Sequence, residues 1–515
     1  PRALKLAHPP SPSICIGAMA ASGEGLLAAE AGFRRFPSGE SEGRDAVHRS
    51  VEILEGRRVG KTSMFTSMCL LVQSIVGGGL LTFPHAYKLG GVVNVMVLQL
   101  LLLPFITLGL WVLAWCTERT TASTYQAMVR QSLGRRAEAL CVWVIVILIF
   151  GASVAYLDIL VDQTLPWFQH LEEACAADRG PICAVAALRL HDRSNLTAVV
   201  AIFLTVLCLG RSMASLSLPS LLGFVALLYV CFAIMANFAA GRAAGLGPAA
   251  ASGTLDAGAE GVAWCRSGLR EWLSTIPVIC FSYQGHISAV PVYAELHYRS
   301  TSRWMKVIAM GLGACIVLYN ATGLLGYLQF LEKTDSDILK SFLEHPDAVN
   351  IPGGFMVVGH IAVAMAVAVT CAVFTFCARS AILDELHRLC GCNIESSAVF
   401  YGMTCLWMAA IAAVASCVPD MGAVVSVIGN FSAFFMFQFP GLCLLAAADE
   451  DDEAESRPDA GNAEGKMPRS ISLRLINAGD GLNRRGACLR VLGWTFVALG
   501  TVVFVLGLAS AFYST

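Results

Sequence analysis

Eleven apolar segments dominate the sequence, and each is long enough to cross a lipid bilayer as a helix, which takes about 20 mostly apolar residues. The segments are residues 63–87, 91–117, 139–166, 196–214, 219–240, 271–293, 305–330, 353–377, 399–418, 422–447 and 488–512. Only 14% of the 515 residues are charged, whereas soluble domains average about 25%. The sequence therefore predicts an all-α polytopic membrane protein with eleven transmembrane helices.

Polar stretches divide the chain around these segments. Residues 1–60 are polar and Gly-rich, which predicts a disordered cytoplasmic tail. Residues 61–447 form the predicted membrane-embedded core. Residues 448–486 begin with the acidic run DEDDEAE and predict a solvated, mobile cytoplasmic linker, and residues 487–515 hold the eleventh helix and the C-terminus.

Basic residues set the expected orientation, because cytoplasmic loops carry an excess of Lys and Arg. Arg57, Arg58 and Lys61 precede the first segment, and further arginines follow the second and sixth. This bias predicts a cytoplasmic N-terminus and places the loop after the third segment on the opposite side. The net charge of −2 gives no indication of a nucleic-acid partner.

The loop after the third segment carries two candidate features of a non-cytoplasmic compartment. Asn195 begins an Asn-Leu-Thr glycosylation sequon. Cys175 and Cys183 are candidates for a disulfide, with Cys265 as a competing partner. Most other cysteines lie inside apolar segments, where we expect them to act as small hydrophobic residues.

The first segment contains a run of glycines at its middle. Gly77, Gly78 and Gly79 each cost a helix about 1 kcal/mol relative to alanine, and Pro84 weakens the helix further. In lipid, an interrupted helix is tolerated only where the freed backbone groups are buried in protein or line a wet cavity. The run therefore predicts an unwound stretch from 74 to 79, with close helix packing through small residues as the alternative.

The sixth segment carries a second, polar interruption. Ser282, Tyr283, Gln284, Gly285 and His286 lie at its centre, and polar groups inside a membrane are costly and usually face a cavity. Two interrupted helices that are five helices apart are typical of secondary transporters built from inverted repeats. We expect a 5+5 inverted repeat over about 63–240 and 271–447, with the eleventh helix added.

Interrupted helices offer bare backbone dipoles as a binding site. N–H groups at a half-helix N-terminus suit a carboxylate, and carbonyls at a half-helix C-terminus suit an ammonium group or a metal cation. Neither interruption contains an acid, Lys or Arg, so we expect a neutral, zwitterionic amino acid. The predicted substrate-binding residues are Ser74, Ile75, Val76, Gly77, Gly78 and Gly79 for its amine and carboxylate, and Phe281, Ser282 and Tyr283 for its side chain.

Four stretches resemble motifs of one transporter family. They are QSIVGGGLLTFPHA (73–86), FSYQGHISAVPVYAEL (281–296), TGLLGYLQF (322–330) and TCAVFTFCARSAI (370–382). The chain thus resembles the amino acid/auxin permease superfamily, and within it the sodium-coupled neutral amino acid transporters and fungal vacuolar amino acid transporters. This resemblance implies a leucine-transporter-like fold that moves amino acids by alternating access across a plasma membrane or a vacuolar or lysosomal-type membrane.

The same resemblance implies candidate ion sites. In sodium-coupled members an Asn of span one and a Thr of span eight help to hold sodium. Thr370 stands at the Thr position, and Gln73 stands where the Asn would be. The extra methylene of Gln73 displaces its amide oxygen, so proton coupling is an alternative, with His286 as a candidate proton relay. No cofactor beyond the coupling ion is implied.

These polar residues also have structural interpretations. We expect His286 to make a structural hydrogen bond in preference to relaying protons, and Thr370 has its own helix as an alternative partner. Asp158 and Asp162 are expected to reach the interface near the outer end of the third segment. Tyr319 is expected to be a packing residue.

Two other functional classes fit parts of the pattern. A sensor of the same fold would bind an amino acid and signal with little flux. An intramembrane enzyme would need paired acids on separate spans or a Ser/His pair, and the closest acids share one span, so we expect no enzymatic activity. The prediction is a monomeric secondary transporter of neutral amino acids in a lipid bilayer, coupled to sodium or protons.

Overall fold

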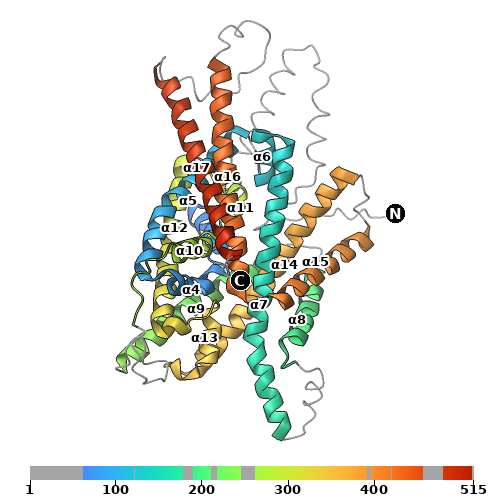
Figure 1. Cartoon of the computed structure of the whole chain (residues 1–515). Coiled ribbons are helices and arrows are strands. Elements are labelled where there is room, and N and C mark those ends of the chain that lie inside the picture. Colours follow the sequence, from blue (N-terminus) through green and yellow to red (C-terminus); the bar gives the residue numbers. More distant parts are fainter. Residues whose placement is uncertain are drawn as a thin grey trace, which may run out of the picture.

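The computed structural model describes residues 62–120, 122–177, 190–209, 217–244, 261–390, 396–418, 420–455 and 480–512, and most of this part of the chain is helical. The expected N-terminal tail, residues 1–60, lies outside the described residues. Figure 1 shows long helices packed side by side.

Eight of the described helices are long and apolar enough to cross a membrane. They are α5 (Val92–Thr120), α7 (Arg135–Ala177), α9 (Ser217–Ala243), α12 (Thr301–Phe330), α14 (Gly353–Cys390), α15 (Ser397–Cys417), α16 (Met421–Glu455) and α17 (Asp480–Phe512). The bent pair α3 (Met64–Ile75) and α4 (Gly79–Gly90) makes a ninth candidate span. The chain is therefore an all-helical polytopic membrane protein, as predicted.

The two remaining predicted spans are shorter or interrupted. The segment expected at 196–214 corresponds to α8 (Arg193–Cys208), whose 16 residues fall short of the length of a regular span. The segment expected at 271–293 is divided into α10 (Leu269–Ser282) and α11 (His286–Ala294). Length and composition alone thus identify up to nine spans among the described residues, where the sequence predicted eleven.

The acidic linker is shorter than expected. We expected a solvated, mobile stretch over 448–486, but α16 continues to Glu455 and α17 begins at Asp480. The helical extension of α16 is held to a neighbouring helix, because Arg119 of α5 forms an ion pair of 2.9 Å with Asp451.

The two ends of the molecule differ in their elements. One end, at the top of Figure 1, carries α6 (Tyr125–Leu133) and the adjoining ends of α16 and α17, and the other carries α13 (Ile338–Glu344) and the end of α7. We call the first the inner side, because the basic loops there predict a cytoplasmic location, and the second the outer side.

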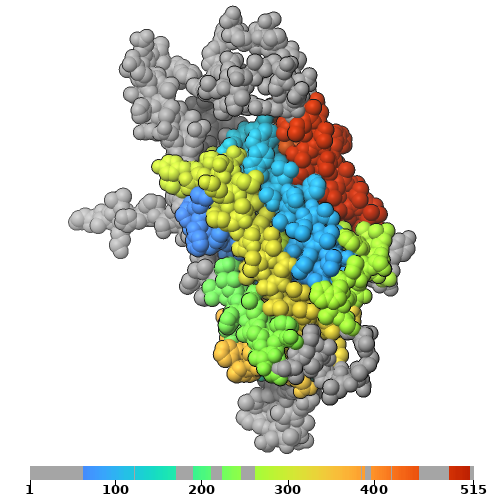
Figure 2. Space-filling view, turned by 90° about the vertical axis from the view of Figure 1, so that its left-hand side faces the viewer, coloured from blue at the N-terminus to red at the C-terminus, as the bar shows by residue number. Residues whose placement is uncertain are grey.

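Apolar side chains cover the lateral surface. Figure 2 shows α5, α12 and α17 exposed on one face of the molecule. Leu100, Val317 and Trp494 on these helices are exposed by 69%, 67% and 63%. Extended apolar surfaces of this kind mark contact with lipid or protein rather than with water.

At the inner side, a short backbone bridge joins two helices that are distant in sequence. Thr62, which precedes α3, pairs with Leu296, which follows α11. The N–H of Thr62 donates to the carbonyl of Glu295 at 3.0 Å, and the N–H of His297 donates to the carbonyl of Thr62 at 2.9 Å. The inner ends of α3 and α11 are therefore fastened together.

Candidate functional site

The first interruption lies where the glycine run predicted it. The two halves α3 and α4 are inclined by 56° to each other. The unwound part, residues 76–78, is shorter than expected, because Ser74 and Ile75 still belong to α3 and Gly79 already belongs to α4. The residue that precedes α4, Gly78, has no side chain with which to cap the helix.

The second interruption also lies where the polar cluster predicted it. Residues 283–285 separate α10 from α11. The residue that precedes α11, Gly285, has no side chain to cap the helix, and no side-chain cap is formed. Each interrupted span therefore has a helix N-terminus inside the protein with the positive end of its dipole uncapped, which favours negative charge.

The two interruptions touch each other through glycine. A Cβ built on Gly79 would lie 2.7 Å from the Cα of Ser282, and a Cβ built on Gly285 would lie 2.5 Å from the Cγ1 of Ile75. Any larger residue at either position would have to displace its neighbour. Both interpretations of the glycine run are therefore correct, because glycine weakens the helix and also allows the second backbone to approach closely.

Tyr319 of α12, which we expected to be a packing residue, joins the two interruptions. Its Oη lies 2.8 Å from the carbonyl oxygen of Ile75 and 2.5 Å from that of Ser282, at the C-terminal ends of α3 and α10. A phenol has one proton and donates to one of them at a time. A tyrosine inside an apolar span could have indicated this role, because a buried hydroxyl needs a hydrogen-bond partner.

Aromatic rings fill the space on the outer side of the interruptions, where α4 leads away from the break. Phe83 stacks on Tyr319 with 4.7 Å between ring centroids, and Tyr283 lies 5.0 Å from Tyr319. Gln99 of α5 donates to the hydroxyl of Tyr283 at 2.8 Å and accepts from Asn320 at 2.9 Å. These contacts join the interruptions to α5 and α12.

A cavity of about 210 Å³ lies against both interruptions, several times the roughly 30 Å³ of one water molecule in the liquid. Its walls come from α3, α4, α7, α9, α10, α11, α14 and α16, and none of its lining residues is charged. Ser288 and Pro291 of α11 and Cys377 of α14 line it beyond the interruptions. The cavity therefore extends from the interruptions toward the inner side.

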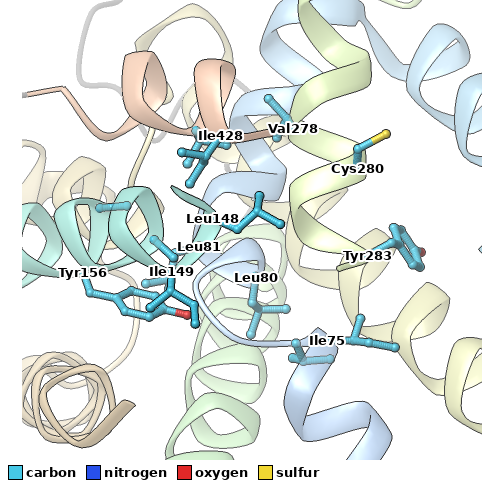
Figure 3. Packing of buried hydrophobic residues seen from close by; sticks show 14 of the residues in the cluster. Ile75, Leu80, Leu81, Leu148, Ile149, Tyr156, Val278, Cys280, Tyr283 and Ile428 are labelled. Atoms are coloured by element: carbon cyan, nitrogen blue, oxygen red, sulfur yellow. The ribbon is translucent and has the colours of Figure 1, made fainter. Parts of the chain in front are cut away.

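Most of the predicted binding residues line this cavity. They are Gln73, Ser74, Ile75, Gly77, Gly78, Gly79, Phe281 and Thr370. Val76, Ser282 and Tyr283, which we expected on its wall, are buried elsewhere. Successive helical residues are rotated by about 100°, so once Phe281 faces the cavity the next two residues face away from it. Figure 3 shows Tyr283 on the side of the broken helix opposite Tyr156, which lines the cavity.

Comparison with known proteins identifies the family. Residues 60–456 match the family described as transmembrane amino acid transporter protein. The chain belongs to this family. The match confirms the resemblance that the four sequence motifs indicated.

Curated relatives agree with this assignment. The chain is 30% identical over 397 residues to human solute carrier family 38 member 8, covering 75% of this chain and 85% of the relative. It is 26% identical over 408 residues to sodium-coupled neutral amino acid transporter 7 of Danio rerio, covering 77% of this chain and 82% of the relative. A crystal structure of an Eremococcus coleocola manganese transporter aligns over 93% of this chain and 89% of that chain, with a TM-score of 0.46 and 12% identity, too low a likeness to carry an argument.

Thr370 and Gln73, the candidate sodium ligands, lie on the wall of the same cavity. The hydroxyl of Thr370 donates to the carbonyl of Ala366 at 2.8 Å, which is the partner on its own helix that we considered as an alternative. A hydroxyl that donates keeps its lone pairs, so its oxygen stays able to bind a cation. Within the described ranges, no group of three or more His, Cys, Asp or Glu residues is arranged to hold a metal.

His286 does not make the structural hydrogen bond that we expected. It is the first residue of α11 and fully buried, and neither ring nitrogen has a partner among the residues that the structure describes. The ring packs against α5, where its Nε2 would lie 2.9 Å from a Cβ built on Gly109. Since His286 does not line the cavity, a proton relay through it stays a prediction.

Gln284 also belongs to the site, although it was not among the predicted binding residues. It lines the cavity, and within the described structure its Oε1 and Nε2 are buried without a hydrogen-bond partner. Leaving buried polar groups unpaired costs about 1–3 kcal/mol. A bound molecule that supplies hydrogen bonds would remove this cost. The signal in the sequence was an uncharged amide inside a membrane span.

The candidate modifications on the outer side stay predictions. Asn195 is exposed in the first turn of α8. The hydroxyl of Thr197 in its sequon is buried and donates to the carbonyl of Arg193 at 2.8 Å. Cys183 and the side chain of Cys175 lie outside the described residues, so the structure does not test their pairing.

Proposed function

We propose that the protein is a secondary active transporter of neutral amino acids that works by alternating access. One observation carries this proposal: two interrupted helices meet at a cavity that has no charged side chain among its lining residues. Bare helix ends without charged neighbours suit a ligand that carries both charges itself. The similarity to a relative named as a sodium-coupled neutral amino acid transporter supports the same substrate class.

The proposal includes eleven spans in a 5+5 inverted repeat. The interrupted pairs α3–α4 and α10–α11 would open the first and second repeat, and α17 would follow them. In this arrangement α8 and α10–α11 are the spans that length alone does not identify. Interrupted helices at corresponding positions of two repeats support it.

In the proposed complex, the substrate lies across the first interruption. Its carboxylate would accept hydrogen bonds from the N–H groups at Gly77, Gly78 and Gly79, at the positive end of α4. Its ammonium group would lie near the carbonyl oxygens at the end of α3, next to Ser74. Its side chain would extend toward Phe281.

The coupling ion would lie beside the substrate. We propose that Gln73 and Thr370 hold sodium with neutral oxygen atoms, with the proton as the alternative ion. The proposal applies equally to a plasma membrane and to a vacuolar or lysosomal-type membrane. An amino acid sensor of the same fold with little flux is the second candidate, supported by the long segment before residue 62.

Uptake by reconstituted protein, with sodium and proton gradients varied independently, tests this function. We expect neutral amino acids to be taken up and to exchange in counterflow. With sodium as the coupling ion, Thr370→Val should raise the sodium concentration for half-maximal uptake at least about tenfold, a loss of about 1.4 kcal/mol of ion binding. Thr334→Val, on a threonine outside the cavity, should leave sodium dependence unchanged.

The outcomes separate the alternatives. Flux that follows pH and ignores sodium would reject the ion site at Gln73 and Thr370 but keep transport. Amino acid binding, measured as a thermal shift, together with no counterflow would reject transport and favour the sensor.

A further inference from the structure

A buried carboxyl group on the outer side is not used by the proposed transport. Asp337 precedes α13 and is fully buried, at 0% exposure. Its Oδ1 accepts from the N–H of Leu339 at 2.9 Å, and its Oδ2 accepts from Nε2 of Gln163 on α7 at 2.6 Å. Among the described residues, no cation forms an ion pair with it.

The hydrogen bonds continue from Gln163 to a third helix. The Oε1 of Gln163 is bonded to Nδ1 of His360 on α14. An amide oxygen only accepts, so Nδ1 of His360 carries the proton in this arrangement. Gln163 and His360 are exposed by only 2% and 4%. We call these three side chains, Asp337, Gln163 and His360, the outer chain.

The neighbouring charges leave the carboxyl of Asp337 without a counter-ion. Asp158 and Asp162 of α7, which we expected at the interface, are buried and share Arg193 of α8. Lys340 of α13 pairs with Asp335 at 3.0 Å. Further charged or titratable groups on this side include Glu344 of α13, which also pairs with Lys340, His345 at the end of α13, His85 and Lys88 of α4, and Asp420 before α16.

The outer chain joins α13, which lies against α4, to α7 and α14, and in alternating access these two groups of helices would separate on the outer side. The Ile338 side chain at the start of α13 and Pro84 of α4 both pack against Gly326, where a built Cβ would lie 3.1 Å and 3.0 Å from them. α13 thus lies on the outer half of the first interrupted span. Gln163 and His360 belong to α7 and α14, so outward movement of α4 with α13 would break the hydrogen bonds to them.

We propose that the outer chain is a proton-binding site, in which a proton held by the carboxyl of Asp337 keeps α13 closed over the outer side and loss of that proton favours opening. This proposal rests on the alternating access proposed above. The bound proton would neutralise the buried carboxyl, which has no counter-ion among the described residues in its closed position, although the two N–H donors in part favour its ionised form. Once ionised, the same group would be more stable in water, which it reaches only when α13 lifts.

The sign of the pH effect follows from the two states. Asp337 lies between two membrane spans. Burial, followed by the nearby Asp162, raises its pKa from the ordinary 3.8 to about 7, although the hydrogen bonds from Leu339 and Gln163 lower it. In the open state, exposed to water, the pKa returns to about 3.9. Between these values the closed state holds a proton that the open state releases. The ratio of closed to open protein should therefore fall about tenfold for each unit of rising pH between pH 4 and 7, and stay constant above pH 7.

A distance measurement tests this without requiring transport. Spin labels would be attached at Glu344→Cys, exposed on α13, and at Cys417, exposed at the outer end of α15, with the other accessible cysteines replaced by serine. In full-length protein in lipid, we expect the closed distance to gain population as the pH falls from 7.5 to 5. A distance distribution that does not change over this range overturns the proposal.

Three variants identify the titrating group. Asp337→Asn keeps the size of the side chain and one of its two acceptor oxygens but stays neutral, so the closed distance should dominate at every pH. Asp420→Asn, a carboxylate on the same side outside the outer chain, should keep the pH dependence of the parent. If His360→Gln abolishes the pH dependence and Asp337→Asn preserves it, the proposal is overturned. A pH-dependent distance without amino acid flux would instead reject transport and leave this proton site in place.

Discussion

Replacing Gly79 by alanine is expected to reduce amino acid uptake by about one to two orders of magnitude. The added Cβ would lie 2.7 Å from the backbone of Ser282, so the two interruptions must move apart. Overpacking of this kind costs about 1–3 kcal/mol, and each 1.4 kcal/mol corresponds to about a factor of ten. Initial rates of uptake by reconstituted protein, normalised to the amount of folded transporter, measure the effect.

Gly313→Ala provides the matched control. Gly313 lies on α12, and a Cβ built there meets no atom within 4 Å. Alanine is favoured over glycine in a helix by about 1 kcal/mol, so this variant should transport normally and be at least as stable as the parent. Normal uptake by Gly79→Ala would show that the close approach of the two interruptions is not required for transport.

Tyr319→Phe is expected to reduce uptake by roughly tenfold or more while the protein still folds. The change removes only the hydroxyl that bonds the carbonyls of Ile75 and Ser282. The two buried carbonyls then lose the one proton that they share, and leaving a buried acceptor unpaired costs about 1–3 kcal/mol. Because these carbonyls end the half-helices α3 and α10, the loss should appear as a higher KM for the amino acid.

Tyr229→Phe is the corresponding control. The hydroxyl of Tyr229 donates to the carbonyl of Phe355 at 2.9 Å, at an exposed site away from both interruptions. Its removal should leave the KM unchanged. If the two variants lower the melting temperature equally and neither changes the KM, Tyr319 serves stability alone.

The positions of both interruptions could be predicted from the sequence because their cause is local. Gly77, Gly78 and Gly79 weaken a helix by themselves, and the polar run at 282–286 is unfavourable in lipid wherever it is placed. The family resemblance added Thr370 and Gln73, which the fold brings to one cavity.

The role of Tyr319 could not be predicted in this way, because it depends on contacts between distant segments. Its two acceptors lie 244 and 37 residues away in the sequence. The prediction that Ser282 and Tyr283 line the cavity was wrong for a related reason. Periodicity fixes the angle between neighbouring residues, but which residue of a broken helix faces the cavity depends on how the whole helix is rotated in the bundle.

In the proposed transporter, the bridge between Thr62 and Leu296 would restrict how an amino acid leaves toward the inner side. α3 and α11 are joined there by backbone hydrogen bonds, and again near the cavity, where the hydroxyl of Ser288 donates to that of Ser74 at 2.7 Å. We therefore expect α3 and α11 to move together, so that no exit route opens between these two helices. We expect release along the wall formed by α14, where Phe374 and Cys377 line the cavity.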